Sequence, residues 1–211
     1  MDSTSRLLGL PPYVSDPQDL SNSSNPFPDS IGSQFRYIDE ETLLKYGFGV
    51  SLAEAEAMDF VSSHTSIKCP KVIGAYVLNG KGHIMMPYEQ GDYVGGFNRN
   101  PCVADEFEWD SPQSDYKYGP YPDEYGFNEG IMEAISRASP LPPRTDPESA
   151  GYNNMYATRQ LVHSLRGHEV VFAHGDLNAG NILIRDDLTV VILDWCTASF
   201  YPAYWEWYKA T

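Results

Sequence analysis

The sequence predicts an α+β fold in two parts: a small sheet with one helix, and a helical part that carries a hairpin. Three observations support this prediction. Residues 51–64 have the start signal and spacing of an amphipathic helix. Two apolar runs, 71–78 and 83–88, flank an Asn-Gly turn and predict a β-hairpin. Two further helical patterns, at 127–139 and 152–165, precede a second apolar hairpin.

The first part is expected to follow a disordered tail. Residues 1–34 contain eight serines and five prolines with few large apolar side chains, so burial cannot offset the entropy of ordering them. Residues 35–90 then form the small sheet and its helix. Ser51 and Glu54 have the S-x-x-E spacing of a capping box. Glu54 also shares a helical face with Met58, which puts a carboxylate at the start of an apolar stripe.

The second part is separated from the first by a segment without periodicity. Residues 91–126 hold eight acids and two bases and predict an irregular acidic loop, which is either functional or a sign that a scaffold element is missing. Residues 127–211 form the C-terminal part. Within it, 170–173 is predicted as a short buried strand, and 181–184 and 189–193 as a hairpin.

Composition excludes several classes of protein. The 211 residues are 42% hydrophobic and carry a net charge of −15, which argues against binding nucleic acid or an anionic membrane surface. No apolar run approaches the length of a membrane span, and the N-terminus lacks a secretory signal pattern. The three scattered cysteines form no zinc or disulfide pattern. We therefore expect a cytoplasmic protein; its oligomeric state is left open.

The chemically informative stretch is HGDLNAGNILIRDDLTVVILDW, residues 174–195. Its polar loop contains His174, Asp176 and Asn181, and Asp194 follows where the next strand ends. Because the two strands of a hairpin run antiparallel, Asn181 and Asp194 are expected side by side. An amide oxygen and a carboxylate are ligands that Mg²⁺ prefers.

Asp176 lies in the same loop and can accept a proton. One base and two cation ligands are the parts that phosphoryl transfer needs, because charge neutralisation and positioning supply most of that catalysis. Two alternatives remain. An Asx-rich loop can simply satisfy its own backbone, and a hydrolase could use the same three side chains around a metal.

The motif HGDLNAGN resembles the catalytic loop of the aminoglycoside phosphotransferase and choline kinase family, and ILDW resembles that family's counterpart of the kinase metal-binding motif. The stretch YGFGVSLAEAEAMDFVSSHTSIKCPKVIGAY and the tail SFYPAYWEWYKA are similar to fungal members. The resemblance covers residues 35–90 and 127–210. It implies a protein-kinase-like, two-lobed fold and an ATP-dependent phosphotransferase that acts on a hydroxyl of a small molecule.

The resemblance also implies roles for the loop residues. Asp176 would be the catalytic base that receives the proton of the substrate hydroxyl, and His174 would brace the loop. Asn181 and Asp194 would hold Mg²⁺ on the phosphates of ATP.

In the first part, Lys45 would grip the ATP phosphates, with a surface lysine as the alternative. Glu54 would pair with Lys45, unless it serves only the helix cap, in which case Glu56 is the second candidate. Met86 to Tyr88 would form the hinge whose backbone meets adenine. The proline between them removes one N–H donor there.

Two departures from the family pattern predict an incomplete fold. The helix expected after the hinge is missing, since Gly91 is followed at once by Asp-Tyr-Val-Gly-Gly. The C-terminal helices are also expected to be missing after Thr211. The alternative function is therefore a catalytically inactive, truncated kinase-like relic or a binding protein. Seven acids against one lysine at 105–124 would suit a cationic substrate, or would form a solvated loop.

Overall fold

The structure is a computed structural model that describes residues 6–7, 24–27, 33–93, 121–138 and 150–209. The chain divides into two units. The first unit comprises Met1–Pro101, Phe172–Phe200 and Trp205–Thr211, and the second comprises Cys102–Val171 and Tyr201–Tyr204. Helices and antiparallel strands occur along the chain, so the predicted α+β class is confirmed.

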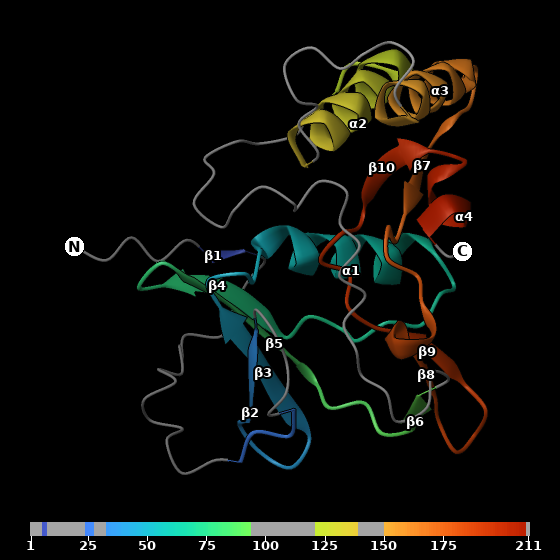
Figure 1. Ribbon diagram of the computed structural model, residues 1–211. Helices are drawn as coiled ribbons and strands as arrows, with labels where there is room; N and C mark the ends of the chain where they lie inside the picture. Colours follow the sequence, from blue (N-terminus) through green and yellow to red (C-terminus); the bar gives the residue numbers. More distant parts are fainter. Residues whose placement is uncertain (1–5, 8–23, 28–32, 94–120, 139–149, 210–211) are drawn as a thin grey trace. The chain divides into compact units, whose positions relative to one another are not determined.

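The first unit contains a five-stranded antiparallel sheet (Figure 1). Its strands are β1 (Arg6–Leu7), β2 (Gln34–Tyr37), β3 (Thr42–Gly47), β4 (Gly74–Leu78) and β5 (Lys81–Pro87), in the spatial order β1-β4-β5-β3-β2. Asn79 and Gly80 join β4 to β5 with φ angles of 52° and 74°, the left-handed values that a type I′ hairpin turn requires. The predicted hairpin is confirmed. Along β3 and β5, Lys45 lies opposite Ile84.

Helix α1 (Leu52–His64) packs against one face of this sheet. The Ser51 side chain begins it, since its Oγ accepts a hydrogen bond from the Ala53 amide at 3.1 Å. Buried side chains of the helix and the sheet form one core, with the members Leu43, Val50, Ala55, Ala57, Met58, Val61, Cys69, Ala75, Ile84, Met86 and Trp195. Trp195 comes from the C-terminal hairpin region, so this core joins residues far apart in the sequence.

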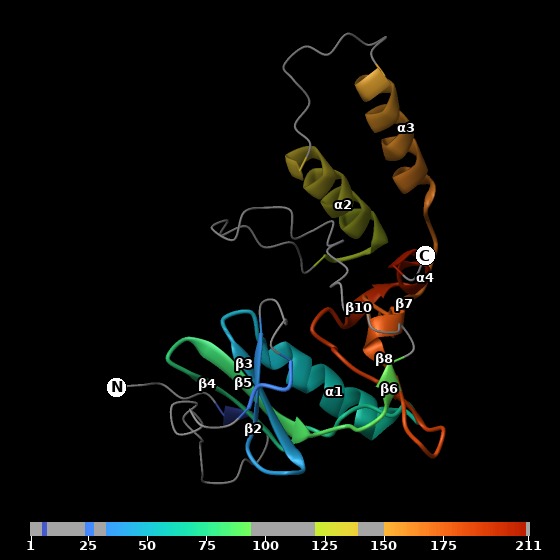
Figure 2. The ribbon, with the colours of Figure 1, turned by 60° about the horizontal axis from the view of Figure 1, so that its bottom comes forward.

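A three-stranded sheet in the same unit contains the predicted hairpin. Strands β8 (Ile182–Ile184) and β9 (Val190–Ile192) form it, β6 (Asp92–Tyr93) pairs with β8, and the 3₁₀ turn η1 (Ala179–Asn181) precedes β8. Figures 1 and 2 both show β6 beside β8. Residues 88–91 connect β5 directly to β6 and contain no helix.

Two helices dominate the described part of the second unit. They are α2 (Glu124–Ala138) and α3 (Ala150–Ser164), which pack against each other (Figure 2). The Asn128 side chain, only 2% exposed, donates to the carbonyls of Val162 and Leu165 at 3.3 and 2.9 Å and accepts from the Tyr204 hydroxyl at 2.6 Å. The Leu165 carbonyl lies just past the end of α3, where the helix itself supplies no partner, whereas the Val162 carbonyl also accepts from the Leu165 amide at 3.2 Å.

Some short elements were not predicted. The strand β7 (Val170–Ala173) was expected, whereas its partner β10 (Ser199–Pro202), the helix α4 (Trp205–Lys209) and β6 were not. Each is two to five residues long, which is too short for a hydrophobic period to distinguish helix from strand.

The predicted tail contributes Arg6–Leu7 to the sheet as β1, and Phe27 packs edge-on against Phe35 with ring centroids 5.0 Å apart. Most of the tail, and residues 94–120 of the predicted acidic loop, lie outside the described residues. The domain boundaries stay predictions. Among the helices in the described ranges, none has both the length and the apolar composition to cross a bilayer.

Candidate functional site

Lys45 lies at the centre of a buried charge cluster. Its Nζ atom lies 2.8 Å from Glu54 Oε1 and 2.9 Å from Asp194 Oδ1. The side chains of Lys45 and Glu54 are 8% and 2% exposed, whereas that of Asp194 is 44% exposed. Strand β3, helix α1 and the segment after β9 therefore meet at one buried ammonium group. Of its two partners, Asp194 is the one that solvent reaches.

The cluster shifts the pKa of each of its members. Burial disfavours the charged form of Lys45, but the carboxylates of Glu54 and Asp194 outweigh it and raise the lysine pKa above its usual value. Burial raises the pKa of Glu54 against the effect of Lys45. Burial also opposes ionisation of Asp194, but the ammonium lowers its pKa overall. Of two carboxylates that share one cation, the deeper one carries the larger desolvation cost.

The structure decides between the alternatives for Glu54. Ser51 caps α1 through Ala53, while the Glu54 carboxylate binds Lys45 instead of closing the predicted capping box. The prediction that the Glu54 side chain caps the helix in return is therefore wrong. Glu56, the second candidate partner of Lys45, is exposed. The buried Glu54 Oε2 atom has no hydrogen-bond partner within the described residues, which fits its raised pKa.

The polar loop brings Asp176 and Asn181 together. The Asn181 Nδ2 atom donates to the backbone carbonyl of Asp176 at 2.9 Å and to its Oδ2 atom at 3.0 Å. Because Nδ2 faces Asp176, the amide oxygen of Asn181 is the atom with which this residue could ligate a cation. The side chain of Asn178 caps the intervening turn by accepting from the Gly180 amide at 2.8 Å.

His174 contacts both ends of the hairpin region. Its Nε2 atom lies 2.9 Å from the Leu193 carbonyl, and its Nδ1 atom lies 3.2 Å from the Asp176 amide. A carbonyl can only accept and an amide N–H donates, so these contacts assign a neutral ring with the proton on Nε2. The ring also meets Trp195 edge-on at 4.7 Å. These contacts give His174 the geometry of a brace for the loop.

Asp194 lies at the same end of the hairpin as Asn181. The Leu193 amide donates to the Asn181 carbonyl at 2.8 Å, so Asp194 comes one residue after a direct partner of Asn181. Asp194 has a φ of 57°, a left-handed conformation that is uncommon outside glycine and clusters at functional sites. The predicted proximity of the two hairpin ends is confirmed by this backbone bond.

The backbone of the predicted hinge residues pairs with the neighbouring strand β3 and the residue before it. Met86 lies opposite Leu43 in the ladder between β3 and β5. The Tyr88 amide donates to the Glu41 carbonyl at 2.7 Å. Since proline has no N–H, neither Pro87 nor Tyr88 offers an N–H to a nucleobase. Any base contact from Tyr88 would have to use its carbonyl, so the hinge contact with adenine stays a prediction.

Sequence reasoning missed three side chains around this site. The Glu206 Oε2 atom, from α4, accepts a hydrogen bond from the Gly175 amide at 3.1 Å, and Thr197 donates to the His174 carbonyl at 2.9 Å. Arg185, at the end of β8, binds Glu89. No spacing rule connects Glu206 to a loop 31 positions earlier; only the resemblance of the C-terminal tail to family members hinted that it matters.

The residues present fit a magnesium ion bound together with phosphates. Within the described ranges there is no group of three or more His, Cys, Asp or Glu side chains that could hold a metal. Asn181 and Asp194 offer one amide and one carboxylate. Mg²⁺ commonly keeps several waters and is held by one or two carboxylates plus substrate phosphates, so these two ligands suffice only when a nucleotide supplies others.

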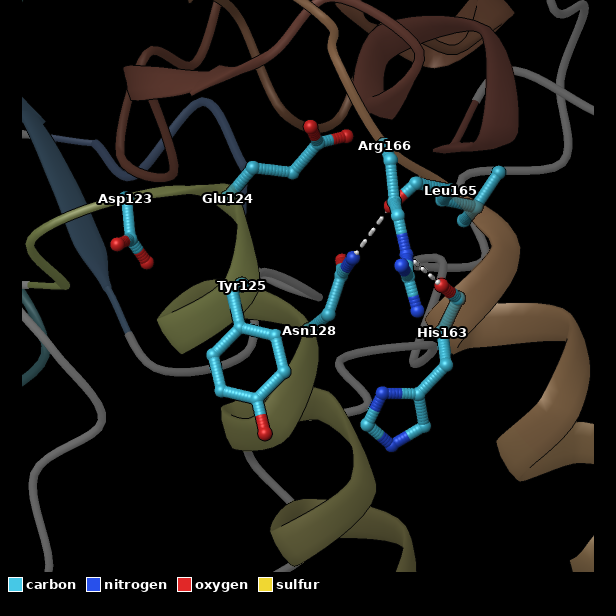
Figure 3. Close-up of a pocket in the computed structure, with 7 residues that line it drawn as sticks. All are labelled: Asp123, Glu124, Tyr125, Asn128, His163, Leu165 and Arg166. Atoms are coloured by element: carbon cyan, nitrogen blue, oxygen red, sulfur yellow. Dashed lines mark hydrogen bonds between the residues drawn. The ribbon is translucent and has the colours of Figure 1, made fainter.

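A separate pocket lies in the second unit (Figure 3). Residues of α2 and the end of α3 line it: Asp123, Glu124, Tyr125, Asn128, His163, Leu165 and Arg166. None of them is a predicted site residue. Several of the polar groups bind protein atoms, as Figure 3 shows for Asn128 with Leu165 and for Arg166 with His163. Glu124 binds His168, which lowers the pKa of its carboxyl against the effect of its own burial.

Together, the small antiparallel sheet with its helix and the loop-hairpin region define an α+β, kinase-like fold. A solved structure of the aminoglycoside phosphotransferase APH(3'')-Id from Streptomyces rimosus matches the chain with a TM-score of 0.53 and 16% identity, over 86% of this chain and 74% of that one. Identity this low establishes the fold alone. Relative to that structure, the kinase-like fold of this chain is incomplete.

Two further solved structures match with lower TM-scores. A spectinomycin phosphotransferase, APH(9)-Ia, matches at a TM-score of 0.47 and 12% identity, over 94% of this chain and 65% of that one. A gentamicin complex of APH(2")-IIa matches at 0.49 and 12%, over 84% and 66%. No family model and no curated protein sequence matches the chain.

Proposed function

We propose that this chain is an ATP-dependent phosphotransferase that moves the γ-phosphoryl group to a hydroxyl of a small molecule. The observation that carries the proposal is the Lys45 ammonium held between Glu54 and Asp194, in the same unit as the loop of Asp176 and Asn181. A buried ammonium beside an accessible carboxylate suits a site for phosphates and their cation.

In this proposal the two carboxylates around Lys45 have different roles. Glu54 orients Lys45, whose charge faces the nucleotide phosphates. Asn181 and Asp194 would hold Mg²⁺, which when bound neutralises phosphate charge. The ionised state of Asp194, favoured by Lys45, is the state that a cation ligand needs.

Asp176 is the proposed base. Its Oδ2 atom receives a hydrogen bond from Asn181 at 3.0 Å, which orients the carboxylate. The acceptor hydroxyl would give its proton to Asp176 as its oxygen attacks the γ-phosphorus and the bond to the β-phosphate oxygen breaks, with ADP leaving. His174 holds the loop in place through its hydrogen bonds with the Leu193 carbonyl and the Asp176 amide.

The acceptor is proposed as a hydroxyl-bearing small molecule, and one that carries an amine would suit the acidic composition at 105–124. The solved structure APH(3'')-Id is an aminoglycoside phosphotransferase, so aminoglycosides are suitable members of the acceptor panel. Cys69 and Cys196, which are free thiols in the described part of the chain, fit the proposed cytoplasmic location.

The test is phosphoryl transfer from [γ-³²P]ATP with Mg²⁺ to a panel of hydroxylated amines, together with calorimetric MgATP binding. We expect saturable nucleotide binding and transfer to at least one acceptor. Lys45→Met should weaken nucleotide binding, whereas Arg159→Met, which removes an exposed ion pair of the second unit, should not. An unmutated chain that neither binds MgATP nor transfers phosphate would refute the proposal.

The second candidate is a nucleotide-binding protein without turnover. The direct run from β5 through residues 88–91 into β6, with no helix between them, favours it, because small misplacements of reacting groups cost much rate. MgATP binding that raises the melting temperature, without transfer to any acceptor, would select this candidate.

A further inference from the structure

The connection between β5 and β6 lies directly on the hairpin that carries the proposed cation ligands. Strand β6 pairs with β8, with Asp92 opposite Ile184. Gly91 approaches β8 so closely that a Cβ atom on it would lie 2.4 Å from the Ile184 carbonyl oxygen. Only glycine fits there without moving the backbone. The four residues 88–91 therefore suffice to connect the five-stranded sheet to the hairpin.

An ion pair secures this connection at its midpoint. The Glu89 carboxylate binds the Arg185 guanidinium, which follows β8. The Glu89 side chain is only 11% exposed, whereas that of Arg185 is 41% exposed. Burial raises the pKa of the Cys69 thiol, and the charge of the nearby Glu89 raises it further. Arg185 is the cation that compensates Glu89, and a mostly buried carboxylate without one is strongly disfavoured.

The other strand of the hairpin is held as well. The Ile192 amide donates to the Lys68 carbonyl at 2.8 Å, and Lys68 forms a parallel bridge with Val191. Lys68 follows α1, which carries Glu54, while Glu89 follows β5, which pairs with the strand of Lys45. The segment that holds β9 thus continues α1, which carries Glu54. The segment that holds β8 continues β5, the neighbour of the strand that carries Lys45.

We propose that the Glu89–Arg185 pair is a positioning clamp, which holds the hairpin at its turn end and so fixes Asn181 and Asp194, at the other end of the same two strands, against Lys45. The connection after β5 is then a rigid strut that holds the proposed phosphate site assembled, rather than a hinge. The clamp rests on the proposed function only for its catalytic consequence; its mechanical part stands on the contacts alone. Neither Glu89 nor Arg185 touches the reacting groups in this proposal.

The experiment compares Arg185→Met, Glu89→Gln and the conservative Arg185→Lys with the matched control Arg159→Met, which removes an exposed Arg–Glu pair of the second unit. Amide hydrogen exchange of β6, β8 and β9 reports the clamp without any need for activity. MgATP affinity, kcat and the acceptor KM report its consequence. Circular dichroism identifies any variant that fails to fold, and Arg185→Lys, which keeps the charge, remains informative in that case.

We expect faster exchange in β6 and β8 for Arg185→Met, partial recovery in Arg185→Lys and no change in the control. MgATP affinity should weaken and kcat should fall by about 10²-fold, the scale of a 1 Å misplacement, while the acceptor KM stays the same. Unchanged exchange, or faster exchange with normal nucleotide affinity and kcat, overturns the positioning clamp. If exchange responds but the unmutated chain never binds MgATP, the proposed function fails and the mechanical clamp stands.

Discussion

The division of roles between two carboxylates can be tested at the level of single residues. Asp176→Asn should abolish transfer and leave MgATP affinity nearly intact, because the proposed cation ligands remain; a general base typically contributes about 10²–10⁴-fold in rate. Asp194→Asn should instead weaken MgATP binding, because a charge facing the cation is lost. Transfer and calorimetric binding measured on both variants check this. Equal loss of binding in the two variants would contradict the separate roles.

The buried cluster also predicts a pH dependence of stability. The pKa of Glu54 is raised in the folded state by burial, so the free energy of unfolding should decrease as pH rises from the ordinary carboxyl pKa through the raised value. Compared with the unfolded chain, the fold shifts the Glu54 equilibrium toward the protonated form. Glu54→Gln should remove this slope. Urea unfolding at a series of pH values measures it, with the exposed Glu56→Gln as control; identical slopes for both variants would show that Glu54 is not the responsible group.

The residues of the polar loop were predictable, but their partners were only partly so. The spacing of Asn181 and Asp194 around an apolar hairpin was sufficient to place them together, because antiparallel pairing follows from a local pattern. Glu54 was predicted as the first candidate partner of Lys45 and Glu56 as the second, but the sequence alone could not decide between them. Both lie at the start of one helix, and the rotation of α1 against the sheet, which decides between them, depends on the packing of the whole core.

Among the elements, α1 has a cap whose contribution can be measured. The Ser51 Oγ atom accepts from the Ala53 amide at 3.1 Å, so Ser51→Ala should lower the free energy of unfolding by about 0.5–2 kcal/mol. Ser62→Ala is the matched control, because the Ser62 hydroxyl donates to the Asp59 carbonyl within the same helix and caps nothing. Equal effects of the two substitutions in urea unfolding would argue against capping by Ser51.

Elements with strong local signals were predicted and weak ones were missed. The Asn79-Gly80 turn needs two left-handed residues, and few sequences supply them, so β4 and β5 follow from the dipeptide. Strand β6 has two residues and exists because β8 offers a partner. Pairing partners distant in the sequence leave no local periodicity, which is why β6 and β10 could not be predicted. The helix α4 has only five residues, too few for a helical period to show.

At the scale of the whole molecule, the two units should respond differently to substitution. Asn128→Ala in the second unit breaks three hydrogen bonds of a buried amide and should lower stability by about 1–3 kcal/mol. MgATP affinity should stay the same, because every proposed nucleotide ligand belongs to the first unit. Thermal unfolding and calorimetry test both statements, with Arg137→Met as an exposed control on the same helix. A large loss of MgATP affinity in Asn128→Ala would mean that the second unit takes part in nucleotide binding.

The contact between His174 and Trp195 has an optical consequence. The indole is 4% exposed, its Nε1 atom donates to the Ile192 carbonyl at 3.0 Å, and the imidazole lies edge-on to it at 4.7 Å. An indole in such a dry environment emits at shorter wavelength than a solvated one such as Trp207, which is 73% exposed. In a variant that keeps Trp195 as its single tryptophan, red-shifted emission would therefore indicate that the loop has moved away from the indole.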